Sequence, residues 1–428
     1  MDFWNVLGRG YSWLYRAFWI LVLIFLISRS TVQLSGPVEQ VRTYTSDVEF
    51  EFLGWTLGAL AQKFEQFGLG AASYLDDADR KAAVLQYFEL MGEERRLEGE
   101  LKSYLADPEQ EENGVEAEAL QEALGDLRDE MAKLQPFVET ILQEQVAYVL
   151  ADLGMGAGGA VFPPVAFEFT KVPVSLIVSP REIIDQMANI PLDPGLTLDQ
   201  KITLEEQVDV GLDASSLVVN IGGIGTYPTM VVESGSLPWV INTIAHEWVH
   251  NYLTLRPLGI NFYTSPDMRT MNETVASIVG DEVGRQVLRR YYPELLPPEE
   301  AAESSAPEEP PADPPAFDFR AEMHETRIMA DQLLAEGRIE EAEEYMESRR
   351  QVFWEHGYRI RKLNQAYFAF HGAYADVPEG PAGKDPVGEA VRDLWSLIDS
   401  PAEFLRKMAW MNEFADLLEA IEVSKANR

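Results

Sequence analysis

The sequence of 428 residues contains no cysteine. Disulfide bonds and thiolate metal sites are therefore excluded, and any metal ion must be held by His, Asp, Glu or water. Basic residues are also scarce, since 34 Lys and Arg stand against 71 Asp and Glu and give a formal net charge of -37. A surface of this charge repels phosphate backbones, so we expect no nucleic-acid partner.

Long hydrophobic runs are rare too, and the one that stands out is at the start of the chain. Residues 11–28 read YSWLYRAFWILVLIFLIS, in which Arg16 is the only charge. In a helix this stretch would rise about 27 Å, close to the roughly 30 Å of a bilayer's hydrocarbon core. No small-x-small cleavage pattern follows it. We therefore expect a single transmembrane helix that contacts the lipid bilayer.

The charges around this run predict its orientation. Arg9, Arg16 and the α-amino group precede its uninterrupted apolar part, residues 17–27, and only Arg29 and Arg42 follow it closely. Positive charge is retained on the cytoplasmic side. We therefore expect a single-pass membrane protein, with residues 1–30 as cytoplasmic tip and anchor and the bulk of the chain outside the cytoplasm.

The next segment, residues 31–155, has the pattern of a helical hairpin or stalk. Residues 74–107 and 115–153 are rich in Leu, Ala, Glu and Lys, and apolar residues recur at three- to five-residue steps in the second stretch. Such a stripe is typical of an amphipathic helix. Core packing within the chain and oligomerisation through the hairpin are both compatible with it.

Three further segments follow. Residues 156–296 mix strand-like and helix-like patterns, and residues 297–316 are an acidic Pro-rich linker or loop without apolar anchors. Residues 317–428 again read as helices, which we expect to close a cleft. The expected strands of the mixed segment are Val165–Thr170, Val174–Val178, Ser216–Ile221 and Thr229–Glu233, and Arg181–Asn189 is expected to be a helix.

The strongest chemical signal is the segment His-Glu-Trp-Val-His. It is expected on a helix that begins near Ser236, a good N-cap, with Pro238 in the first turn. Residues four apart share a helix face, so His246 and His250 can face one metal ion. Glu247 then lies beside the same ion, where a general base is needed. The alternative is that the two histidines are packed in a helix interface.

Two histidines leave a catalytic zinc site incomplete, because such a site normally has three protein ligands and one open position. The other histidines lie beyond the linker, so a carboxylate is the natural third ligand. Glu273 is the best candidate, with Asp281 and Glu282 in reserve. We expect it to open a second helix, antiparallel to the first. A carboxylate that stabilises the first turn of a helix is the alternative.

These residues carry a resemblance to a known family. A His-Glu-x-x-His helix followed by Asn-Glu-x-x-Ala on the next helix resembles the gluzincin zinc metallopeptidases, over about Ser236 to Arg290. The resemblance implies that His246, His250 and Glu273 bind Zn²⁺ and that Glu247 is the base. It also implies a zincin-like core with a small mixed sheet and an active-site helix.

The resemblance implies a substrate-binding strand as well. An edge strand just before the metal helix would bind extended peptide or protein substrate by β-augmentation, a role for Thr229, Val231 and Glu233. The exopeptidase signature Gly-x-Met-Glu-Asn is absent. Endopeptidase and aminopeptidase activity therefore both remain open.

One departure from the family concerns the outer partners of the imidazoles. Thermolysin-like enzymes carry an Asp four residues after the third ligand, and here that position is Ser277. We expect Asp281 or a backbone carbonyl to orient one imidazole instead, with Asn272 and Ser277 as the other candidate side chains. Such outer partners hold the ligand rings in place.

A hydrogen-bond donor for the oxyanion is also needed. Tyr367, His371 and Tyr374 lie at four- and three-residue steps and can share one helix face. Their stretch faintly resembles one found in bacterial proteins described as aminopeptidases. Aromatic packing is the competing interpretation.

Together these patterns predict a mostly helical α+β chain that hydrolyses peptide bonds with zinc. The competing prediction is a membrane-tethered helical scaffold or binding protein with a vestigial zincin domain.

Overall fold

The computed structural model describes residues 36–69, 75–105, 114–157, 160–296, 317–372 and 386–426. The expected transmembrane helix is wrong for this fold, because no helix in these ranges is both long and apolar enough to cross a membrane. The stretch 11–28, on which that expectation and the single-pass location depended, lies outside the described residues, as does the linker 297–316. The fold class is corrected to a mostly helical α+β arrangement, in whose described residues no membrane-spanning helix is found.

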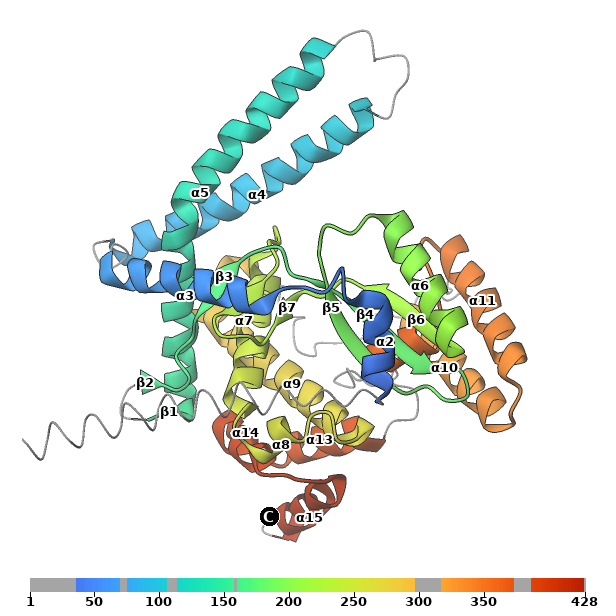
Figure 1. Ribbon diagram of the computed structural model, residues 1–428. Coiled ribbons are helices and arrows are strands. Elements are labelled where there is room, and N and C mark those ends of the chain that lie inside the picture. Colours follow the sequence, from blue (N-terminus) through green and yellow to red (C-terminus); the bar gives the residue numbers. More distant parts are fainter. Residues whose placement is uncertain are drawn as a thin grey trace, which may run out of the picture.

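The N-terminal part is helical, and two of its helices form a long arm. The helices are α2 (Pro37–Thr45), α3 (Phe52–Leu69), α4 (Asp77–Leu105) and α5 (Gly114–Leu150). In Figure 1, α4 and α5 run side by side and project away from the rest of the molecule. Tyr87, Met91 and Met131 are buried in one apolar cluster, and Arg128 on α5 pairs with Glu94 on α4. The apolar stripe therefore packs within the chain, and oligomerisation through it stays a prediction.

One antiparallel sheet has β4 (Val174–Pro180) at its centre, between β5 (Ala188–Leu192) and β6 (Ala214–Val219). The expected helix over residues 181–189 is wrong. Instead the chain turns and returns as β5, with Ala188 opposite Val178. Alternate residues of β5 are buried, which is the period of a strand. Helix α6 (Leu198–Leu212) contributes Leu204 and Val208 to the core beside this sheet.

A second small sheet has the order β3-β8-β7, formed by Phe167–Phe169, Thr229–Val231 and Gly223–Ile224. Strand β3 is parallel to β8, and β7 is antiparallel to it. Side chains of α5 cover the outer edge of β3, since Glu139 accepts a hydrogen bond from the Phe169 amide and Gln143 one from the Phe167 amide. Strand β7 forms the other edge. A short π-helix (Ala151–Met155) and the pair β1 (Gly156–Ala157) and β2 (Ala160–Val161) connect α5 to this sheet.

The centre of the core is the helix pair α7 (Leu237–Leu253) and α9 (Pro266–Tyr291), joined through α8 (Pro257–Ile260). Ser236 caps α7, as its sequence predicts. Ser265 caps α9, so this helix begins two turns before Glu273 and not at it. The helices run antiparallel and very close: a methyl group on Gly280 would lie 3.1 Å from the Cα of His246, and one on Gly284 would collide with Asn242.

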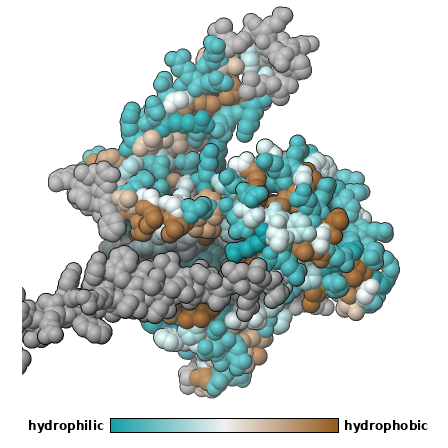
Figure 2. Space-filling view, viewed as in Figure 1, coloured by the Kyte–Doolittle hydropathy of each residue, from teal (hydrophilic) through white to brown (hydrophobic). Residues whose placement is uncertain are grey.

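The C-terminal helices divide into two groups. Helices α10 (Phe319–Ala335), α11 (Ile339–Glu355) and α12 (Gln365–His371) lie on the side of β4 and β6. Helices α13 (Pro386–Ser396), α14 (Pro401–Ala409) and α15 (Phe414–Ala426) lie below α9 in Figure 1, and a 3₁₀ turn (Pro293–Leu295) ends the α9 region. Hydrophilic residues cover most of the face in Figure 2, including the hairpin, as the net charge leads one to expect.

The close approach of α7 and α9 gives a test with an internal control. Gly280→Ala should lower the free energy of unfolding by about 1–3 kcal/mol, because the new methyl overpacks the contact with the His246 backbone. Gly92→Ala on α4, where a methyl meets no atom within 4 Å, should instead raise it by about 0.5–1 kcal/mol. Urea unfolding of both variants measures the difference. Equal stabilisation by both would contradict the close packing.

Candidate metal centre

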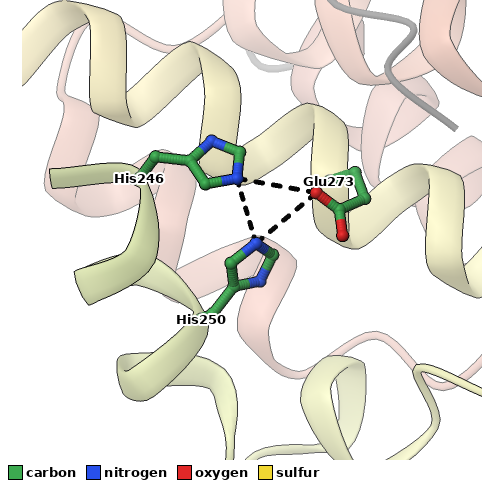
Figure 3. Close-up of side chains that lie close together, drawn as sticks. All are labelled: His246, His250 and Glu273. Atoms are coloured by element: carbon green, nitrogen blue, oxygen red, sulfur yellow. Dashed lines mark hydrogen bonds and ion pairs between the residues drawn. The ribbon is translucent and has the colours of Figure 1, made fainter. Parts of the chain in front are cut away.

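Three side chains from the central helix pair converge on one point. His246 and His250 come from successive turns of α7, and Glu273 comes from the facing turn of α9. Figure 3 shows both imidazoles turned toward the carboxylate of Glu273. The antiparallel packing of α7 and α9 produces this convergence, because it brings the end of α7 beside the first half of α9.

The distances suit a metal ion. The two histidine Nε2 atoms are 3.1 Å apart, and each is 3.5 Å from Oε2 of Glu273. The point equidistant from these three atoms lies about 2.0 Å from each, which is the length of zinc–nitrogen and zinc–oxygen bonds. The Glu273 side chain is 12% exposed, and its Oε2 accepts no hydrogen bond within the described chain. This group can hold a metal ion.

Asn272 fixes the orientation of His250. Its Nδ2 donates a hydrogen bond to the carbonyl of Leu258 at 3.1 Å, so its Oδ1 faces Nδ1 of His250 at 2.8 Å. A carbonyl oxygen only accepts, so Nδ1 of His250 must carry the proton. In the neutral ring that binds a metal, the lone pair of His250 is therefore on Nε2, inside the triangle. The sequence suggested Asn272 as an outer partner, and the structure gives it that contact.

Asp281 and Ser277 were the other expected outer partners. Asp281 accepts a hydrogen bond of 2.9 Å from Asn242, which lies one turn before His246 on α7. It also directly follows Gly280, which touches the His246 backbone. Ser277 is half-buried on α9, and no hydrogen bond in the described chain joins it to either imidazole.

The electrostatics of the group follow from burial and opposite charge. Burial alone raises the pKa of Glu273, but the neighbouring imidazoles outweigh it and hold this pKa well below its usual range. Burial lowers the pKa of His250, yet the Glu273 carboxylate reverses the effect and raises it to about 9. Burial also raises the pKa of Glu247, against the opposing effect of the two histidines.

Glu247 and His250 lie directly under strand β7. A methyl group on Gly223 would lie 2.9 Å from Oε1 of Glu247, and one on Gly225 would lie 2.9 Å from Cβ of His250. Only glycine permits this approach of a strand to the helix. The sequence did not predict a strand at residues 222–225, because glycine has low strand propensity. The glycine spacing was the available signal.

The expected substrate strand is therefore corrected. Thr229 and Val231 lie on β8, the central strand of the sheet, with β3 on one side and β7 on the other. Both residues are buried, and neither edge of β8 is open to a peptide. Glu233 follows β8, and its carbonyl accepts a hydrogen bond from Arg95. The edge nearest the metal group is β7.

Two of the proposed oxyanion donors, Tyr367 and His371, lie on α12, and their role stays a prediction. Tyr367 and His371 lie together on α12 with ring centroids 4.3 Å apart, and α12 packs against β4 and β6. No hydrogen bond, ion pair or ring contact in the described chain joins either ring to His246, His250 or Glu273, and Tyr374 lies outside the described residues. Burial raises the pKa of Tyr367 to about 12 and lowers that of His371 to about 4.

Comparisons with protein-family models, with curated proteins and with solved structures find no match to this chain. The interpretation of the site therefore depends on its own geometry.

The contact to Asn272 leads to a prediction for metal affinity. Asn272→Ala should weaken zinc binding by about 10- to 100-fold, because the imidazole of His250 loses the partner that fixes its tautomer and orientation. Competition with a fluorescent zinc chelator measures this change. Ser277→Ala on the same helix is the control and should leave affinity unchanged. Equal affinity of the Asn272 variant and the unaltered chain would contradict the role.

The low pKa of His371 predicts that the fold loses stability as the pH falls. Its pKa of about 4 in the fold lies below the value of about 6.5 expected in the unfolded chain. The unfolded state thus binds more protons between these values, so stability falls as pH drops from about 6.5 to 4, by about 2 kcal/mol. His371→Gln should reduce this loss. Urea unfolding at pH 7 and pH 5 tests it, and an unchanged pH dependence would contradict a buried neutral imidazole.

Proposed function

We propose that this chain is a zinc-dependent peptide hydrolase. The observation that carries the proposal is the triangle of His246, His250 and Glu273, whose donor atoms are equidistant from a point about 2.0 Å away. Glu247 is next to it on the same helix. Three protein ligands leave a fourth position open for water or substrate, which is the arrangement of catalytic zinc sites.

The donor set favours zinc among the common metals. Two imidazoles and one carboxylate suit zinc, whereas magnesium and calcium favour sites built from oxygen donors. The carboxylate Oε2 of Glu273 is buried without a hydrogen-bond donor in the described chain. A cation at the centre of the triangle would bind this oxygen and balance its negative charge.

Each residue then has a defined task. When bound, zinc polarises the substrate carbonyl and lowers the pKa of a coordinated water. Glu247 takes the proton of the attacking water and returns it to the leaving amine. Its carboxylate is held between α7 and Gly223, so its position is set before substrate arrives.

Strand β7 supplies the surface for the peptide. The Gly222 carbonyl accepts a hydrogen bond of 2.9 Å from the Val232 amide across the strand pair. Bonded and non-bonded positions alternate along an antiparallel pair. The amide and carbonyl of Gly223, the next residue, therefore point away from β8, and an extended peptide can pair with them beside the metal group.

Two substitutions separate metal binding from chemistry. Glu247→Gln should retain about one zinc per chain but lose hydrolysis by at least about 100-fold, because the amide cannot accept the proton of water. Glu273→Ala should lose zinc. Elemental analysis and cleavage of a fluorogenic peptide library measure the two effects.

Glu282→Gln is the matched control for the third ligand. Glu282 lies on α9 and contacts Arg285 and Gln286 on its own helix. This variant should keep both zinc and activity. Loss of zinc from it, or retention of zinc by Glu273→Ala, would overturn the ligand assignment, and undiminished cleavage by Glu247→Gln would overturn the role of the base.

A further inference from the structure

The connection between β7 and β8 is fastened to the end of the metal helix by one side chain, Asn251. Its Nδ2 donates hydrogen bonds to the Thr226 carbonyl and to the Thr229 hydroxyl, each at 3.0 Å. A side-chain amide nitrogen has two N–H groups, so both donors are used. The Thr226 carbonyl can only accept, and this fixes the orientation of the amide.

The connection is itself well ordered by local bonds. The Thr226 amide donates to the Ile224 carbonyl at 2.7 Å, and the Thr226 hydroxyl donates to the Pro228 carbonyl at 2.8 Å. The end of β7 and the start of β8 therefore move with Thr226. A bond that fixes Thr226 relative to α7 also fixes β7 relative to α7.

The glycine contacts described above cannot do this alone. Gly223 and Gly225 set how closely β7 approaches Glu247 and His250. Contacts of this kind resist further approach but offer little resistance to sliding of the strand along the helix. Hydrogen bonds are directional. Those of Asn251 fix the position of β7 along α7.

We infer that Asn251 is a positioning residue for peptide binding, which holds the open edge of β7 at a set position relative to His246, His250 and Glu273. The inference rests on the function proposed above. Asn251 itself touches neither the peptide nor the metal ligands' donor atoms. Thr229 has a corresponding role: it anchors Asn251 and does not contact the substrate.

The experiment compares Asn251→Asp with Thr229→Val in the full-length, zinc-loaded chain. The aspartate has the same shape as asparagine but no N–H, so its carboxylate faces the Thr226 carbonyl and cannot donate to it. The valine at position 229 removes the hydroxyl, which is one of the two acceptors of Asn251. In a Glu247→Gln background, where the peptide is not cleaved, the dissociation constant of a labelled, capped alanine–leucine hexapeptide is measured. The KM and kcat for the same peptide are measured with Glu247 present.

Asn251→Asp should raise the dissociation constant and the KM of the hexapeptide about 10-fold, as misplaced substrates do. Thr229→Val should raise both less, and zinc content should be unchanged in both variants. Asn412→Asp is the matched control, since its amide also donates to a backbone carbonyl, that of Trp410, near the C-terminal helices. It should leave all values unchanged.

Two results would overturn the inference: unchanged hexapeptide binding in both Asn251→Asp and Thr229→Val, or loss of zinc in Asn251→Asp, which would place its effect on the metal ligands. Failure of the hydrolytic function gives a different result. In that case no chain cleaves the peptide, yet Asn251→Asp still weakens hexapeptide binding in the Glu247→Gln background, which supports the positioning role.

Discussion

The close contact between α7 and α9 is the constraint on which the candidate site depends. Gly280 allows the α9 backbone to lie against the His246 backbone, and Gly284 leaves room for Asn242. A wider separation would move Glu273 away from the two imidazoles and open the triangle of donor atoms. The buried face of α9 supports this contact, since Val275, Ala276, Val279 and Val283 are all at most 1% exposed.

A second feature of the structure is that most of its strand edges are covered. Exposed strand edges invite pairing with other chains, and here side chains or backbone cover most of them. The Val218 amide of β6 donates to Glu205, and Asn364 donates to the Ser216 carbonyl. The segment before α3 pairs with β5, and α5 covers β3. Against this background, the glycine edge of β7 beside Glu247 is a place where an extended chain can be added.

The sequence allowed the metal helix to be predicted closely, because Ser236, Pro238 and the histidine spacing are local signals. Glu273 could be anticipated as a ligand from an antiparallel pair of helices. The start of α9 could not, since the helix was expected to open at Glu273 and Ser265 caps it two turns earlier. The sequence did not predict strand β7, because the role of its glycines depends on their contact with α7, which lies outside any local pattern. The placement of α12 depends on packing against β4 and β6, which no local pattern reveals.

The length of α5 lets this one helix reach both the projecting arm and the sheet beside the candidate site. Its 37 residues extend over about 55 Å at 1.5 Å per residue. One end forms the projecting arm with α4, and the other carries Glu139 and Gln143, which hold β3. Strand β3 pairs with β8, and β8 pairs with β7. One helix thus forms part of the projecting arm and, beyond Pro136, holds the sheet beside the candidate site.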